Sequence, residues 1–132
     1  MKIRFSFLRA KHLKLGKKGE DRVCEFLQNR GGLIIQRNYR RFKDEIDIIA
    51  LDGNVLCFVE VKTRMAPLKT RPAWGLSQEQ KKRIRRAAKH YLSEIGNPHL
   101  PYRFDLAELV FNRWDICEFR YWENNFNADS SS

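Results

Sequence analysis

Hydrophobic residues recur with a helical spacing in the first quarter of the chain. Val23, Phe26 and Leu27 lie at positions i, i+3 and i+4, and two consecutive glycines then interrupt the pattern. This spacing predicts a helix over residues 15–30. The preceding residues 1–14 are rich in Lys and Arg. We expect them to form a basic N-terminal arm that either docks through its aromatic residues or stays mobile.

A second helical pattern follows the middle of the chain. Ser77 is a suitable N-cap, and Gly96-Asn97-Pro98 ends the pattern. One face of this predicted helix is apolar and consists of Ile84, Ala87, Ala88, Tyr91, Leu92 and Ile95. The opposite face is basic and consists of Lys81, Lys82, Arg85, Arg86 and Lys89. Residues 63–76 show no periodicity, which indicates a flexible loop before the helix.

Five segments have the composition and alternation of strands: 33–39, 45–51, 54–62, 102–111 and 114–121. Between the second and third, a tight hairpin turn is predicted, centred on Asp52-Gly53 or on Gly53-Asn54. The order αβββαββ predicts an α/β fold with a mixed central β-sheet flanked by helices. A single domain over 15–126 accommodates these elements, and the polar tail 127–132 is expected to be disordered.

Charge is concentrated in one part of the 132-residue chain. The whole chain has 26 Lys and Arg against 16 Asp and Glu, and the excess lies in residues 1–90. Such a concentration indicates a polyanionic partner such as nucleic acid, with a merely solvated basic surface as the alternative. No segment is apolar enough for a membrane span or a signal peptide, so we expect a soluble, cytoplasmic protein without a membrane partner. Cys24, Cys57 and Cys117 lie far apart among apolar residues, and we expect reduced packing residues.

Acidic and basic side chains share one face of the predicted hairpin. In either register Asp47 and Glu60 face the same side, within about 5 to 8 Å between their Cβ atoms. Lys62 shares the face of Glu60, because side chains two residues apart on a strand point the same way. Two converging carboxylates repel, and Mg²⁺ or Mn²⁺ would relieve that repulsion. Lys62 could then orient or help deprotonate a metal-bound water, or stabilise charge at phosphorus; the alternative is that it only neutralises Glu60.

Ordered motifs around these residues resemble the bacterial YraN family, which is similar to archaeal Holliday junction resolvases. The motifs are Gly16-Lys17-Lys18-Gly19-Glu20, Arg37-Asn38-Tyr39-Arg40, Glu45-Ile46-Asp47-Ile48-Ile49, Phe58-Val59-Glu60-Val61-Lys62-Thr63-Arg64 and Arg103-Phe104-Asp105. The resemblance implies the restriction-endonuclease-like fold and the PD-(D/E)xK nuclease site. It implies the catalytic residues Glu20, Asp47, Glu60 and Lys62. The expected metal ligands are Asp47, Glu60 and Glu20, with the backbone carbonyl of Val61 as a further candidate.

Several neighbouring residues have a structural interpretation beside the functional one. Glu20 could instead be a first-turn carboxylate favoured by the helix dipole. We interpret Glu45 as a surface or supporting acid and Asp105 as the ion-pair partner of Arg103. Trp74 could stack on an unpaired base or belong to the core. The three histidines, His12, His90 and His99, are isolated, and we expect no metal at them.

The chain departs from the family pattern at two positions. The family usually has Gly where this chain has Asp44, and Lys where it has Gln80. We expect Asp44 either to alter the turn before the strand or to add an acid near the metal. Gln80 would remove a cation from the phosphate-binding surface.

These features predict a Mg²⁺- or Mn²⁺-dependent, structure-selective endonuclease that hydrolyses phosphodiesters in DNA, branched DNA included. The alternatives are a nucleic-acid-binding module of the same fold with little or no turnover, and a nuclease that acts on RNA. Symmetric cutting of two strands would require a homodimer. Candidate phosphate contacts are Arg37, Arg40, Arg41, Lys43, Arg64, Lys69, Arg71, Lys81, Lys82, Arg85, Arg86 and Lys89.

Overall fold

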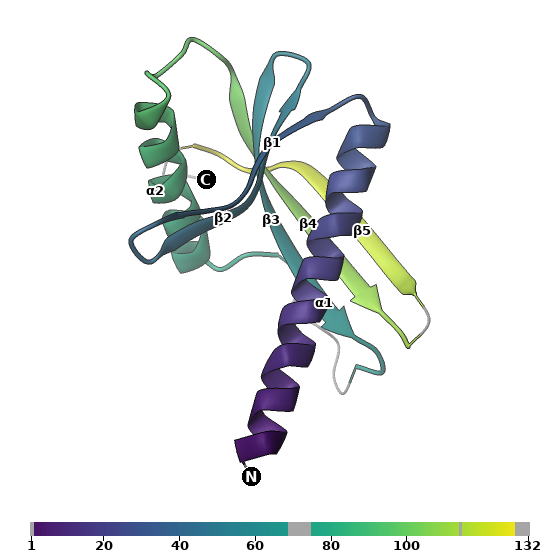
Figure 1. Cartoon of the computed structure of the whole chain (residues 1–132). Coiled ribbons are helices and arrows are strands. Elements are labelled where there is room, and N and C mark those ends of the chain that lie inside the picture. The colour runs from purple at the N-terminus through teal and green to yellow at the C-terminus, as the bar shows by residue number, and fades with distance from the viewer. Residues whose placement is uncertain (1, 69–74, 114, 129–132) are drawn as a thin grey trace.

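The computed structural model describes residues 2–68, 75–113 and 115–128, and their side chains from Lys14 onward. It contains two helices and five strands in the predicted order αβββαββ (Figure 1). The elements are α1 (Lys2–Asn29), β1 (Leu33–Arg41), β2 (Asp44–Asp52), β3 (Val55–Met65), α2 (Gln78–Glu94), β4 (Tyr102–Phe111) and β5 (Ile116–Phe126). Lys69, Arg71, Trp74 and most of the expected tail lie outside the described residues.

A single mixed sheet organises the fold, as predicted. Its strand order is β1-β2-β3-β4-β5, with β3 and β4 parallel and the other neighbouring pairs antiparallel. The two helices cover opposite faces, so the sheet separates two hydrophobic clusters (Figure 1). Residues of β3 from Leu56 to Val59 are buried on both faces. Burial on both sides explains why this strand is a nearly continuous apolar run.

The β2–β3 hairpin adopts the second of the two predicted registers. Its turn consists of Gly53 and Asn54, and Asp52 pairs with Val55. Gly53 has a φ of +63°, which glycine adopts without steric cost. The pairing ends at Ile48 opposite Val59, one residue before Asp47 and Glu60. The local turn therefore brings Asp47 and Glu60 to the position just beyond the last pair of the ladder.

Helix α1 begins at Lys2, so the N-terminal segment that we expected to be a separate arm is continuous with the predicted helix. Gly16 alone does not interrupt it, since one helical glycine costs only about 1 kcal/mol and good helix formers precede it. The first half of α1 projects beyond the sheet (Figure 1). The second half packs closely, because a Cβ at Gly19 would lie 1.9 Å from Thr63 Cγ2.

Helix α2 starts as predicted, whereas β5 differs from its predicted bounds. The Ser77 side chain accepts a hydrogen bond from the Gln80 amide, and the Gln80 side chain accepts one from the Ser77 amide, which forms a capping box. Strand β5 runs five residues beyond the predicted end. The Phe126 ring stacks on Phe104 with centroids 4.7 Å apart, and this long-range contact holds a polar stretch in the sheet.

The structure tests the expectations for the three cysteines and for membrane-spanning segments. Cys24 and Cys57 are buried and unpaired, as expected, whereas Cys117 is exposed on β5 and is not a packing residue. Within the described residues, no helix combines the length and the hydrophobicity that a membrane crossing requires.

Candidate metal and nucleic-acid site

The predicted acidic pair lies where β2 parts from β3. Past the rung between Ile48 and Val59, the Asp47 side chain replaces the main-chain partner, and its Oδ2 accepts a hydrogen bond from the Val61 amide at 2.8 Å. This bond fixes the Asp47 carboxylate beside Glu60. Because β2 and β3 separate here, no main-chain hydrogen bond of the sheet lies between the carboxyl groups of Asp47 and Glu60.

Glu60 lies in an unfavourable environment for a negative charge. Burial, followed by a side-chain hydrogen bond and charge repulsion from Asp47, raises the pKa of Glu60 well above its usual value. Glu45 adds to this repulsion, while Lys62 opposes it. Protonation of Glu60 relieves this repulsion. A divalent cation could take the place of that proton.

Lys62 is held beside Asp47 and Glu60 by Gly75, a residue of the loop before α2. Its Nζ donates a hydrogen bond to the Gly75 carbonyl oxygen at 2.6 Å, and the Gly75 amide donates to Glu108 Oε1 at 2.8 Å. Glu108 is 1% exposed and pairs in register with Lys62 across the parallel strands. Its Oε2 has no hydrogen-bond partner among the described residues. The sequence analysis missed Glu108, although an acid inside the apolar run of β4 was a detectable signal.

Glu20 lies near Asp47 but is not part of a three-acid cluster. Burial and the negative charge of Asp47 raise the pKa of Glu20, and its oxygen lies 3.5 Å from the Arg37 guanidinium. Asn38, which the sequence analysis did not assign, also hydrogen-bonds this carboxyl group. Among the described residues, no three His, Cys, Asp or Glu side chains are close enough together to hold a metal ion. The structure thus brings together Asp47, Glu60 and Lys62, with Glu20 alongside.

The residues that depart from the family pattern have structural partners. Asp44 is buried, and its two oxygens accept hydrogen bonds at 3.0 Å from Arg86 on α2. This ion pair lowers the pKa of Asp44 and ties the β1–β2 hairpin to α2. Asp44 is therefore not an extra acid at the candidate metal site. Gln80 serves in the capping box and so has a role in folding.

Asp105 is structural, as expected. It is completely buried, and Arg103 Nε donates to its Oδ1 at 3.0 Å. The Tyr121 hydroxyl donates to Oδ2 at 2.6 Å, and the Asn124 amide donates to Oδ1 at 2.9 Å. These bonds satisfy the carboxylate and link β4 to β5.

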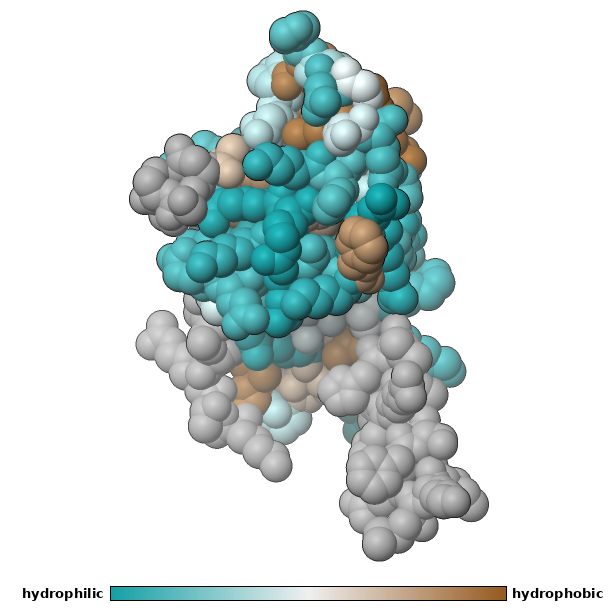
Figure 2. All heavy atoms as spheres, turned by 90° about the vertical axis from the view of Figure 1, so that its left-hand side faces the viewer, coloured by the Kyte–Doolittle hydropathy of each residue, from teal (hydrophilic) through white to brown (hydrophobic). Residues whose placement is uncertain are grey.

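The candidate phosphate contacts divide into engaged and exposed side chains. Arg37 and Arg40 are ion-paired with acids, and Lys81 and Arg85 pack over the Phe126 ring. Lys43, Lys82 and Lys89 are exposed, and no ion pair is found for them among the described side chains. The side of the molecule shown in Figure 2 is predominantly hydrophilic.

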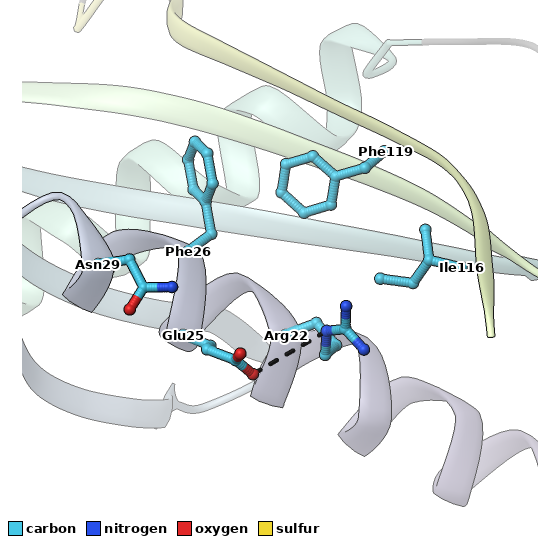
Figure 3. A pocket seen from close by; sticks show the side chains of 6 residues that line it. All are labelled: Arg22, Glu25, Phe26, Asn29, Ile116 and Phe119. Carbon is cyan, nitrogen blue, oxygen red and sulfur yellow. Dashed lines mark ion pairs between the residues drawn. The ribbon is translucent and has the colours of Figure 1, made fainter.

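Helix α1 lines several hollows in the described part of the chain, and two of them differ in how they relate to the predicted site. One, of about 610 Å³, lies between α1 and the β1–β2 hairpin; it contains Glu20, Arg37 and Arg40 in its wall and therefore adjoins the acidic site. The other, of about 280 Å³, lies between α1 and β5. Figure 3 shows Phe26 and Phe119 facing one another there, with an Arg22–Glu25 ion pair at its edge. This second hollow contains none of the predicted site residues.

The strand order and the two covering helices define an α/β protein whose fold is consistent with the restriction-endonuclease-like fold. A sequence profile of the Uncharacterised protein family UPF0102 matches residues 19–109. A UPF0102 protein of Chlorobium phaeobacteroides is 44% identical over 109 residues, which cover 80% of this chain and 86% of that protein. A UPF0102 protein of Dictyoglomus turgidum is 36% identical over 114 residues, which cover 86% of this chain and 97% of that protein. The chain belongs to the UPF0102 family, and the predicted YraN membership is confirmed.

Proposed function

We propose that this protein is a Mg²⁺- or Mn²⁺-dependent endonuclease that hydrolyses phosphodiesters in DNA, with branched DNA as its preferred substrate. The observation that carries the proposal is the convergence of two carboxyl groups, Asp47 and Glu60, at the point where β2 leaves β3. Lys62 lies on the same side. An acidic pair with an adjacent cation is a costly arrangement in a fold unless it serves a ligand.

The donor set fits a hard divalent cation. Mg²⁺ is commonly held by one or two carboxylates, with water and substrate phosphate completing its coordination. Asp47 and Glu60 would hold it, and the Val61 carbonyl and Glu20 are the further candidate ligands. Such a cation, when bound, would polarise the phosphate and lower the pKa of a water.

The chain's own residues would bind and orient the substrate. Lys62, positioned through the Gly75 peptide, presents a positive charge next to the acids and would stabilise negative charge that develops on the phosphate. Exposed lysines on α2, Lys82 and Lys89, would contact the DNA backbone without reading its sequence. Two copies of the chain in a homodimer would cut two strands symmetrically.

A nucleic-acid-binding module with little turnover is the second candidate. It is favoured by the absence of a three-ligand cluster among the described residues. In that case the acidic pair would bind a cation too weakly for catalysis, and the basic surface would retain its role.

A cleavage panel distinguishes the two candidates. Labelled duplex, single-stranded, flap and four-way-junction DNA, with RNA counterparts, would be incubated with Mg²⁺ or Mn²⁺ and with wild-type protein, Asp47→Asn or Lys62→Ala. Metal-dependent cuts in DNA that both variants lose, with DNA affinity retained, support the endonuclease. Salt-sensitive binding without cuts by any protein contradicts it and supports the binding module. Cuts confined to RNA would contradict the choice of substrate.

A further inference from the structure

The tip of the β1–β2 hairpin exposes an aromatic ring. Phe42 is 85% exposed, the highest value among the exposed large hydrophobic residues in the described part of the chain. The side chain leaves most of its apolar surface in water, although burying a phenylalanine contributes about 1.5–3 kcal/mol. Packing inside the fold therefore does not account for an aromatic residue at this position.

The backbone at Phe42 is strained as well. Phe42 and Lys43 are the two central residues of the turn, and only Phe42 has a positive φ, of +56°. This sign pattern is that of a type II′ turn, whose first central position normally has glycine. The other described non-glycine residues with positive φ are all asparagines, which tolerate that region. A bulky residue at such a position is a sign of function.

Positive charge surrounds the exposed ring. Arg40 and Arg41 precede Phe42, Lys43 follows it, and the Arg41 guanidinium lies 5.1 Å from the ring centroid. The nearest acids in sequence are engaged, since Asp44 pairs with Arg86 and Glu45 lies 3.7 Å from Arg40. The His90 ring on α2 meets Phe42 edge-on with centroids 6.0 Å apart. The tip thus combines an apolar wedge with cations, a combination suited to a nucleic-acid partner.

We infer that Phe42 is a wedge that inserts between bases at the branch point of a DNA junction, while the flanking cations hold the adjacent phosphates. Apolar side chains inserted between bases unstack them, and this costs least where stacking is already interrupted. Phe42 lies in the turn before β2 and Asp47 lies on β2, five residues further along the chain, which corresponds to at most about 16 Å at the rise of a β-strand. That distance corresponds to about five base-pair steps. The inference rests on the proposed function and assigns the substrate feature that the site would recognise.

The test compares junction and duplex binding in the Asp47→Asn background, which separates binding from cleavage. The variants are Phe42→Ala, Phe42→Trp and Phe42→Gly, and Leu33→Ala is the control because Leu33 is another exposed apolar residue, 62% exposed, at the far end of β1. A fluorescent base analogue at the branch point reports unstacking. Sedimentation velocity without DNA reports self-association, and an RNA junction tests the class of nucleic acid.

We expect Phe42→Ala and Phe42→Gly to weaken junction binding roughly tenfold and to abolish the analogue signal, because base–aromatic contacts contribute on this scale. Duplex affinity should stay within about twofold, and Phe42→Trp and Leu33→Ala should behave as the parent. Phe42→Gly should lose no thermal stability, since glycine suits the turn, and this excludes misfolding as the cause.

Unchanged junction preference and analogue signal in Phe42→Ala would overturn the wedge while leaving metal-dependent cleavage, and so the proposed function, intact. Loss of self-association in place of junction binding would overturn it in favour of a contact between two copies of the chain. Equal loss on RNA and DNA junctions would overturn the assignment to DNA. A parent protein that binds no DNA would overturn the proposed function together with the wedge.

Discussion

Glu60 is half-buried beside Asp47, and its raised pKa determines how the residue contributes to stability. The folded state favours the protonated carboxyl group, so ionisation destabilises the fold as pH rises above the ordinary pKa of 4.5 toward the raised folded pKa. We predict that Glu60→Gln raises the melting temperature by a few degrees at pH 7 in EDTA. The same variant should lose the stabilisation that Mg²⁺ gives the wild type.

Thermal melts with and without Mg²⁺, at pH 5 and pH 7, test this prediction. The difference between wild type and Glu60→Gln should be larger at pH 7 than at pH 5. Glu118→Gln on β5 is the matched control, because Glu118 is half exposed and distant from Asp47 in the sheet. A variant that melts lower than wild type in EDTA would show that the ionised Glu60 stabilises the fold.

Glu108 positions Lys62 through a single residue, Gly75. We predict that Glu108→Leu lowers the cleavage rate at least tenfold with little change in DNA affinity. The Gly75 amide would lose its hydrogen-bond acceptor, and Lys62 would then lose its fixed position. Glu108→Gln keeps an acceptor oxygen and should restore most of the rate. Single-turnover kinetics beside equilibrium binding separate the two effects. Equal rates for Leu and Gln variants would contradict a positioning role.

The contact between helix α1 and strand β3 depends on Gly19. We predict that Gly19→Ala destabilises the fold by about 1–3 kcal/mol, because the new methyl group overlaps Thr63 Cγ2. Thr63→Ala should restore much of this loss in the double variant. Gly16→Ala is the control, since a Cβ there meets nothing within 4 Å and alanine favours a helix. Denaturant unfolding measures all four proteins, and additive losses at positions 19 and 63 would contradict the overlap.

The secondary structure is largely predictable from the sequence because its signals are local. The capping residue Ser77, the hairpin turn and the alternation along β2 and β3 all act within a few residues. The predicted start of α1 and end of β5 were wrong, because a basic segment extends a helix that the apolar pattern does not mark, and because Phe126 is held by Phe104 from another strand. Strand alternation likewise suffices to put Asp47 and Glu60 on one side of the hairpin, since both possible turns give that result.

Site residues that depend on distant pairing were not predictable. Glu108 lies beside Lys62 and binds the Gly75 amide because β3 and β4 pair in parallel. The crossover through α2 sets that register. Arg86 was assigned to DNA, yet it binds Asp44 across 42 residues of sequence. The strained backbone of Phe42 has no signature in composition. Such contacts become visible only in the folded chain.

At the scale of the whole molecule, the basic surface of α2 should govern DNA affinity. We predict that Lys82→Ala with Lys89→Ala weakens binding to duplex and junction alike, and lowers the slope of log affinity against log salt by about 2. Both lysines are exposed, so their removal leaves the core intact. Arg22→Ala is the control because Arg22 pairs with Asp115 at the α1–β5 side. An unchanged slope in the double variant would place the DNA elsewhere.

The most direct test of the central claim is a crystal structure of the protein soaked with Mn²⁺, with an anomalous difference map that locates the ion. The account predicts a peak in contact with both Asp47 and Glu60, and no peak at this position in Asp47→Asn crystals. A well-occupied peak elsewhere, or none in wild-type crystals at millimolar Mn²⁺, would contradict the metal site and with it the proposed hydrolysis.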